Sequence, residues 1–249
     1  MVNQYSPTRG RPSLINSLIK LYSPIYNTEL KAENVTVTTG ANEVAYFLLQ
    51  NIELCGGKVV YVPINPPKEL DQRNTRGEEW TIDSEQFEKA ITSKTKPIHN
   101  TSQTQLQSFH RARELTTLGN ICVKHNVVII SDEVYEHLYF TDSFTRIATL
   151  SPEIGQLTST VGSAGKSFAA TGWRIGWVLS LNAELLSYAA KAHTRICFAS
   201  PSPLQEACAN SINDALKIGY FEKMRQEYIN KFKIFTSIFD ELGNCLYTV

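Results

Sequence analysis

Apolar residues recur at helical spacing in three parts of the chain. In residues 12–22 and 114–125 they fall on one face of a predicted amphipathic helix. Residues 221–240 repeat the pattern over a longer stretch, which predicts a long surface helix. Helices should therefore cover much of the fold.

Polar residues mark where further helices should begin. Asp83 and Asn182 each precede a helical segment, and their side-chain oxygens can accept hydrogen bonds from the first turn. Another helix is expected to start at Ser202, with Pro203 at its first helical position and Gln205 completing a capping pattern.

Short β-branched runs predict the strands. Residues 127–130 are continuously apolar, which is typical of a strand covered on both faces in a parallel sheet. Residues 34–39, 58–64, 158–162 and 177–181 are the other predicted strands. Strands that alternate with helices predict an α/β fold, with a mostly parallel sheet flanked by helices. In such folds ligands bind at the carboxyl ends of the strands.

Composition narrows the classes of function. The chain has 249 residues, 42% of them hydrophobic, which suits one large domain or one domain and part of another. Its 24 basic and 24 acidic residues balance, so we expect a small-molecule function without nucleic-acid or membrane partners. Five scattered cysteines form no paired metal motif and indicate a reducing compartment. We expect a cytoplasmic protein, or a mitochondrial one if a targeting segment precedes Met1.

Lys166 is the most informative residue. It has small neighbours, Ser163 three positions before it and Arg174 eight after it. Serine and arginine can bind a phosphate while the lysine amine forms a Schiff base with an aldehyde, which points to pyridoxal phosphate. A nucleotide-binding phosphate loop is disfavoured, because it needs glycine where Thr160 stands. A surface lysine on a turn is the other interpretation.

Two further groups follow predicted strands. Asp132 can pair with a protonated pyridine nitrogen and Tyr135 with the phenolic oxygen of the same ring, although a capping acid and a packing tyrosine are the alternatives. Gly40-Ala41-Asn42 can cradle an anion through backbone N–H groups, or be a plain turn. Arg174 is suited to bidentate phosphate contact, or is a surface arginine.

Taken in order, these pieces resemble the pyridoxal-phosphate aminotransferases of fold type I, class I/II. Within them the chain is most similar to the kynurenine/glutamine aminotransferase group, and to its yeast-type kynurenine aminotransferases. The match is carried by Asn3-Gln4-Tyr5 with Arg9-Gly10, Thr38-Thr39-Gly40-Ala41-Asn42-Glu43, Ser131-Asp132-Glu133-Val134-Tyr135-Glu136 and Gly162-Ser163-Ala164-Gly165-Lys166-Ser167-Phe168.

The resemblance implies a role for each residue. Lys166 would be the Schiff-base lysine and proton shuttle, Asp132 the partner of the pyridine nitrogen and Tyr135 that of the ring oxygen. The phosphate would be held by Ser163, Arg174, Gly40, Ala41 and Asn42. Tyr5 would reach the phosphate of a neighbouring subunit, which implies a homodimer with shared active sites.

Three departures from the family stand out. Residues 44–50 replace a longer stretch that holds a helix, a strand and the aromatic residue stacked on the ring. Residues 97–112 are polar where a hydrophobic strand and an Asn-Pro-x-Gly turn are expected, as if read out of frame or carrying an inserted loop. The chain reaches Val249 soon after the long helix, so we expect the small C-terminal domain and its substrate-carboxylate arginine to be largely missing.

The expected organisation has three parts. Residues 1–28 form an N-terminal segment and helix, residues 29–216 the large cofactor-binding domain, and residues 217–249 a long helix leading into a truncated small domain. The expected reaction is ping-pong transfer of an amino group from an aromatic amino acid such as kynurenine to 2-oxoglutarate. A cysteine-S-conjugate β-lyase and a catalytically inactive fragment remain as alternatives.

Overall fold

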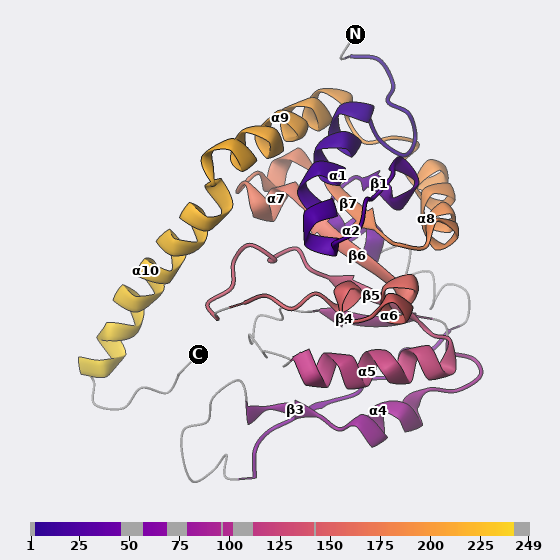
Figure 1. Cartoon of the computed structure of the whole chain (residues 1–249), viewed down its shortest axis with the longest axis vertical. Helices are drawn as coiled ribbons and strands as arrows, with labels where there is room; N and C mark the ends of the chain where they lie inside the picture. Colours follow the sequence, from indigo (N-terminus) through magenta and orange to yellow (C-terminus); the bar gives the residue numbers. More distant parts are fainter. Residues whose placement is uncertain are drawn as a thin grey trace.

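A five-stranded sheet forms the centre of the structure (Figure 1). The computed structural model describes residues 3–45, 57–68, 79–95, 97–101, 112–141 and 143–241. In spatial order the strands are β1 (Val35–Thr38), β7 (Gly176–Leu179), β6 (Thr158–Ser163), β5 (Val128–Asp132) and β4 (Pro97–Thr101). β4, β5 and β6 pair in parallel, and β7 is antiparallel to both β6 and β1. The predicted α/β fold with a mostly parallel sheet is confirmed.

The strand register aligns the carboxyl ends of four strands. Thr38 and Ser163, near the ends of β1 and β6, both pair with Gly176 at the start of β7. Asp132, which ends β5, pairs with Val161 on one side and Thr101 on the other. The loops that follow β1, β4, β5 and β6 therefore leave the sheet at one common edge, together with the loop that enters β7.

Helices cover both faces of the sheet. Ile129 and Leu179 face the side covered by α1 (Pro12–Tyr26), α5 (Ala112–His125), α6 (Pro152–Leu157) and α9 (Ser202–Ile218). Ile130 and Val178, the next positions along their strands, point to the opposite face and pack with Val44 of α2 (Ala41–Ala45) and Leu186 of α8 (Ala183–Ile196). This alternation explains why β5 is apolar at consecutive positions.

The remaining elements lie around this core. α10 (Tyr220–Glu241) extends from α9 away from the sheet, and α4 (Ser84–Ala90) lies near α5 (Figure 1). Asp83 and Asn182 cap α4 and α8 as predicted, because each side-chain oxygen accepts two backbone N–H groups of the first turn. Among the described helices, none is long and apolar enough to cross a membrane.

Three local predictions were wrong. Residues 58–63 are not a strand, and only the two-residue strands β2 (Ile64–Asn65) and β3 (Thr81–Ile82) pair beyond them. A β-branched run forms a strand only where a neighbour takes up its backbone hydrogen bonds, and here Val60 and Tyr61 are exposed instead.

Conversely, Pro97–Thr101 is a strand although its sequence is polar. Its backbone pairs with β5, and Ile98 reaches the cluster around Ile129. The helix predicted to follow a Ser202 cap begins at Ser202 itself, so Pro203 is its second residue. The rest of the irregular stretch, residues 102–111, and residues 46–50 lie outside the described part of the chain.

Candidate functional site

The common sheet edge gathers the residues predicted to hold the ring of a cofactor. Lys166 lies on α7 (Ala164–Ser167), the turn of helix that follows β6, and Tyr135 lies in the turn that follows β5. The Lys166 Nζ atom is 5.0 Å from the centroid of the Tyr135 ring. Asp132 ends β5 half-buried, and its Oδ1 accepts the Val134 backbone N–H at 3.3 Å, which fixes the carboxylate at the strand end. The structure thus brings together the three residues predicted to serve the ring.

Gly40 and Arg174 form the second part of the edge. Gly40 has a φ of +84°, and a Cβ added to it would lie 2.4 Å from Arg174 Nη2. Only glycine allows the guanidinium to lie this close to the turn. Arg174 is itself left-handed, with a φ of 52°, and its Nη1 donates to the Thr171 carbonyl at 3.0 Å. The predicted phosphate arginine and phosphate turn are therefore in contact.

Ser163, Ala41 and Asn42 complete this second part. Ser163 is the last residue of β6 and is buried. A Cβ at Gly176, its partner in β7, would lie 2.7 Å from the Ala41 backbone nitrogen, so the start of α2 packs directly over the strand. Asn42 follows on the exposed side of this turn. We call Gly40, Ser163 and Arg174 the phosphate side, and Asp132, Tyr135 and Lys166 the ring side.

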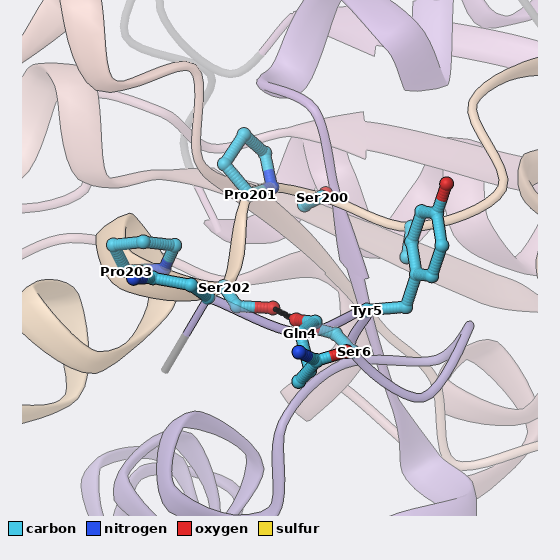
Figure 2. A pocket seen from close by; sticks show the side chains of 9 residues that line it. Gln4, Tyr5, Ser6, Ser200, Pro201, Ser202 and Pro203 are labelled. Carbon is cyan, nitrogen blue, oxygen red and sulfur yellow. Dashed lines mark hydrogen bonds between the residues drawn. The ribbon is translucent and has the colours of Figure 1, made fainter. Parts of the chain in front are cut away.

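Tyr5 lies elsewhere. Its side chain is 86% exposed, and its ring meets the Phe198 ring edge-on, with centroids 5.3 Å apart. It borders a pocket formed by residues 3–6 and 199–203, where Ser202 Oγ donates to the Gln4 carbonyl at 2.6 Å (Figure 2). Within the described part of the chain, no hydrogen bond or ring contact joins Tyr5 to the other predicted site residues.

A buried ionic network supports the ring side, and the sequence analysis missed it. Arg146 binds Glu133 at 2.8 Å and Glu136 at 2.5 Å, the two acids that flank the turn carrying Tyr135. Glu133 also accepts the Ser131 hydroxyl, and Glu136 accepts the hydroxyl of Tyr22. Glu133 and Glu136 are three positions apart within the motif around Asp132, which was the available signal, but nothing local indicates that Arg146 is their partner.

Burial and neighbouring charges shift the pKa values of the two acids in this network in opposite directions. Burial raises the pKa of Glu133 to about 7. The pKa of Glu136 is lowered instead, because Arg146, His137 and the Tyr22 hydroxyl together outweigh its burial. The two carboxylates raise the pKa of Arg146, so that guanidinium stays charged. One buried cation thus pairs with two carboxyl groups, and only Glu133 has a raised pKa.

The edge fits a phosphorylated aldehyde. Arg174 and Ser163 offer donors to a phosphate, and the missing side chain at Gly40 lets the Arg174 guanidinium lie against the turn. Lys166 carries the primary amine that a Schiff base with an aldehyde requires, and its Nζ lies 5.0 Å from the centroid of the Tyr135 ring. The chemistry of these groups agrees with the cofactor predicted from the sequence.

Known proteins resemble this chain in sequence and in fold. A sequence model of the family Aminotransferase class I and II matches residues 1–63 and 47–247. The probable kynurenine–oxoglutarate transaminase BNA3 of Saccharomyces cerevisiae is 84% identical over 265 residues, covering 98% of this chain and 60% of the relative.

Two solved structures extend the comparison. The crystal structure of Bna3p from the same yeast matches with a TM-score of 0.92 and 82% identity, over 98% of this chain and 62% of that one. N-succinyldiaminopimelate aminotransferase from Mycobacterium tuberculosis shares the fold, with a TM-score of 0.85 at 24% identity over 97% and 66% of the two chains. The chain therefore spans less than two thirds of the length of these relatives, and it belongs to the aminotransferase class I and II family.

Proposed function

We propose that this chain carries the cofactor site of a pyridoxal-phosphate-dependent aminotransferase. The substrates would be an aromatic amino acid such as kynurenine and 2-oxoglutarate, which exchange an amino group for an oxo group. The observation that carries the proposal is the convergence of the ring side and the phosphate side on one edge of the sheet. The name of the yeast relative, a probable kynurenine–oxoglutarate transaminase, supports the choice of substrates.

Each side chain has a task in this proposal. When bound, pyridoxal phosphate would supply an aldehyde for the amine and an electron-accepting ring. Arg174 and Ser163 would bind its phosphate, and Asp132 would hold a proton on the ring nitrogen. Lys166 Nζ would anchor the cofactor and then carry the α-proton of the substrate as a general base. The distance of 5.0 Å between Lys166 Nζ and the centroid of the Tyr135 ring supports this role.

The substrate and the assembly belong to the same proposal. The exposed Tyr5 would contact the phosphate site of a second copy, so that a homodimer shares its active sites. The relatives reported above carry aminotransferase names, and they do not favour a β-lyase or an inactive fragment.

The test begins with the absorbance of the purified chain mixed with pyridoxal phosphate. Borohydride reduction and peptide mass mapping on the same sample should place the cofactor on Lys166, and Lys166→Ala should abolish the adduct. Amino transfer is then measured as glutamate formed from 2-oxoglutarate, in the presence and absence of kynurenine. An adduct at another lysine, or none, would overturn the proposal. Pyruvate and ammonia released from a cysteine S-conjugate without transfer would favour the lyase.

A further inference from the structure

A buried acid–imidazole pair lies behind the phosphate side. Glu43, three residues after Gly40, contacts His193 of α8 with a distance of 2.6 Å between Glu43 Oε1 and His193 Nδ1. The His193 side chain is fully buried and that of Glu43 nearly so. The other oxygen of Glu43 accepts the Thr39 backbone N–H. A single carboxylate therefore ties the turn that contains Gly40 to a helix 150 residues further along the chain.

The same turn is held at several further points. Thr38 Oγ1 donates to the Gly40 carbonyl at 3.1 Å, and the Glu43 backbone N–H donates to the same carbonyl at 3.2 Å. Thr39 Oγ1 lies 3.1 Å from Ser200 Oγ. Since Gly40 lies against the Arg174 guanidinium, any movement of this turn changes the space in front of that arginine.

A metal ion is the competing explanation, because Cys197 lies near Glu43 and His193. Their ligand atoms all lie within 4.8 Å of one another, and glutamate, histidine and cysteine can bind zinc. However, two ligands about 2 Å from one zinc ion lie roughly 3 Å apart, which is longer than the contact between Glu43 and His193. Burial and Glu43 also raise the pKa of the Cys197 thiol, which disfavours the thiolate that zinc requires. A hydrogen bond accounts for the pair without an ion.

We propose that Glu43 and His193 are positioning residues for phosphate recognition: they hold the turn of residues 39–43 so that Gly40 stays against Arg174. The inference rests on the proposed function and names two residues that act through Gly40 and Arg174. Their loss should weaken binding of the phosphate specifically. A residue that only stabilises the fold would instead affect every ligand of the site alike.

The experiment compares pyridoxal phosphate with pyridoxal, which lacks the phosphate. Dissociation constants of both are measured by absorbance titration for the wild type, Glu43→Gln, His193→Leu and His193→Asn. Glu43→Gln keeps the shape but loses one acceptor, and we expect the preference for pyridoxal phosphate to fall by about tenfold, the effect of losing one charge-assisted hydrogen bond. His193→Leu should act in the same way.

His193→Asn is the rescue variant. Asparagine can place an N–H near the position of Nδ1, and the other ring nitrogen, Nε2, has no hydrogen-bond partner in the described part of the chain. We therefore expect this variant to keep the phosphate preference. Glu184→Gln removes an exposed carboxylate from the same helix and is the matched control. For variants that bind pyridoxal weakly, the second readout is how strongly inorganic phosphate competes with pyridoxal phosphate for the site.

Several results would overturn the inference. Equal weakening of both ligands in Glu43→Gln and His193→Leu would mean a general structural role. A phosphate preference that disappears with a chelator and returns with zinc would mean a metal site. If the wild type binds pyridoxal phosphate on Lys166 but every variant keeps its preference, only the inference fails. If the wild type forms no such adduct, the proposed function fails, and the inference with it.

Discussion

The arginine of the ring side is buried between two acids, whereas the arginine of the phosphate side is exposed and lies against a backbone turn that Glu43 and His193 hold. Beneath Asp132 and Tyr135, Arg146 is shared between two buried acids. Arg174, by contrast, lies exposed against a left-handed glycine and donates to a neighbouring carbonyl. Both arrangements hold an arginine in place, but only the first removes it from water.

This difference indicates that the ring side contributes mainly to the stability of the fold, and the phosphate side mainly to selectivity for the ligand. Breaking a buried ion pair leaves charges that water cannot reach, so a change beneath the ring side should be felt by the whole fold. On the phosphate side the Arg174 guanidinium is exposed and can move into solvent, so a change that displaces it should act mainly on the ligand.

The largest effect is expected from Arg146→Met. Glu133 and Glu136 would remain buried without their cation, and losing one partner of such a network costs about 3–5 kcal/mol of unfolding free energy. The measurement is urea unfolding followed by circular dichroism. Adding Glu133→Gln and Glu136→Gln should recover much of the loss, because the unpaired charges then disappear.

The control for this prediction is an exposed pair. Lys124 Nζ lies 2.7 Å from Glu88 Oε1 at the surface of α5. Lys124→Gln should leave the unfolding midpoint unchanged, because solvent replaces the contact. If Arg146→Met proves as mild as Lys124→Gln, the buried network does not carry the stability of the ring side.

The next effect concerns pH. The pKa of Glu133 is raised to about 7 from its usual 4.5, so the folded state binds this proton more tightly than the unfolded chain. The stability due to Glu133 is then fully present below pH 4.5 and is lost as pH rises towards 7, with a slope of about 1 kcal/mol per pH unit. Glu136 has a lowered pKa, and its contribution is lost in the opposite direction, as pH falls below its usual range.

The variant Glu133→Gln isolates the contribution of the Glu133 carboxyl group to the free energy of unfolding. The variant cannot ionise at this position, so the difference in unfolding free energy between it and the wild type should change between pH 4.5 and 7 and level off above that range. Urea unfolding at a series of pH values gives this difference directly. Parallel curves for the two proteins would show that Glu133 does not carry the proton.

Much of the fold could be predicted because its signals are local. The apolar run of β5 and the caps Asp83 and Asn182 depend on neighbouring residues, and the structure has them as expected. The secondary structure expected for residues 58–63 and 97–101 was wrong in opposite directions, for one reason. Strand formation requires a partner, and β5 provides one to a polar segment, while the apolar segment has none in the described part of the chain.

The candidate site shows the same limit. The order of strands along the chain predicts that Lys166, Tyr135 and Arg174 lie at one edge of the sheet, because the ends of aligned strands must meet. The residues that support them could not be predicted. Glu43 and His193 are 150 positions apart, and the charges of Glu133 and Arg146 would by default be assigned to the solvent-exposed surface. Only the folded chain shows that these charged side chains are buried and paired.

The smallest effect on stability, and the sharpest test of the comparison, is expected from Gly40→Ala. A left-handed φ of +84° costs an alanine about 1 kcal/mol. The added Cβ would meet Arg174 Nη2 at 2.4 Å, and because Arg174 is exposed, its guanidinium can swing away into solvent. Urea unfolding should therefore change little, while titration should show weaker binding of pyridoxal phosphate and nearly unchanged binding of pyridoxal. Gly172→Ala is the matched control, since a Cβ there meets nothing within 4 Å. A loss of stability as large as that of Arg146→Met would mean that the phosphate side is also part of the structural core, and the division between the two sides would not hold.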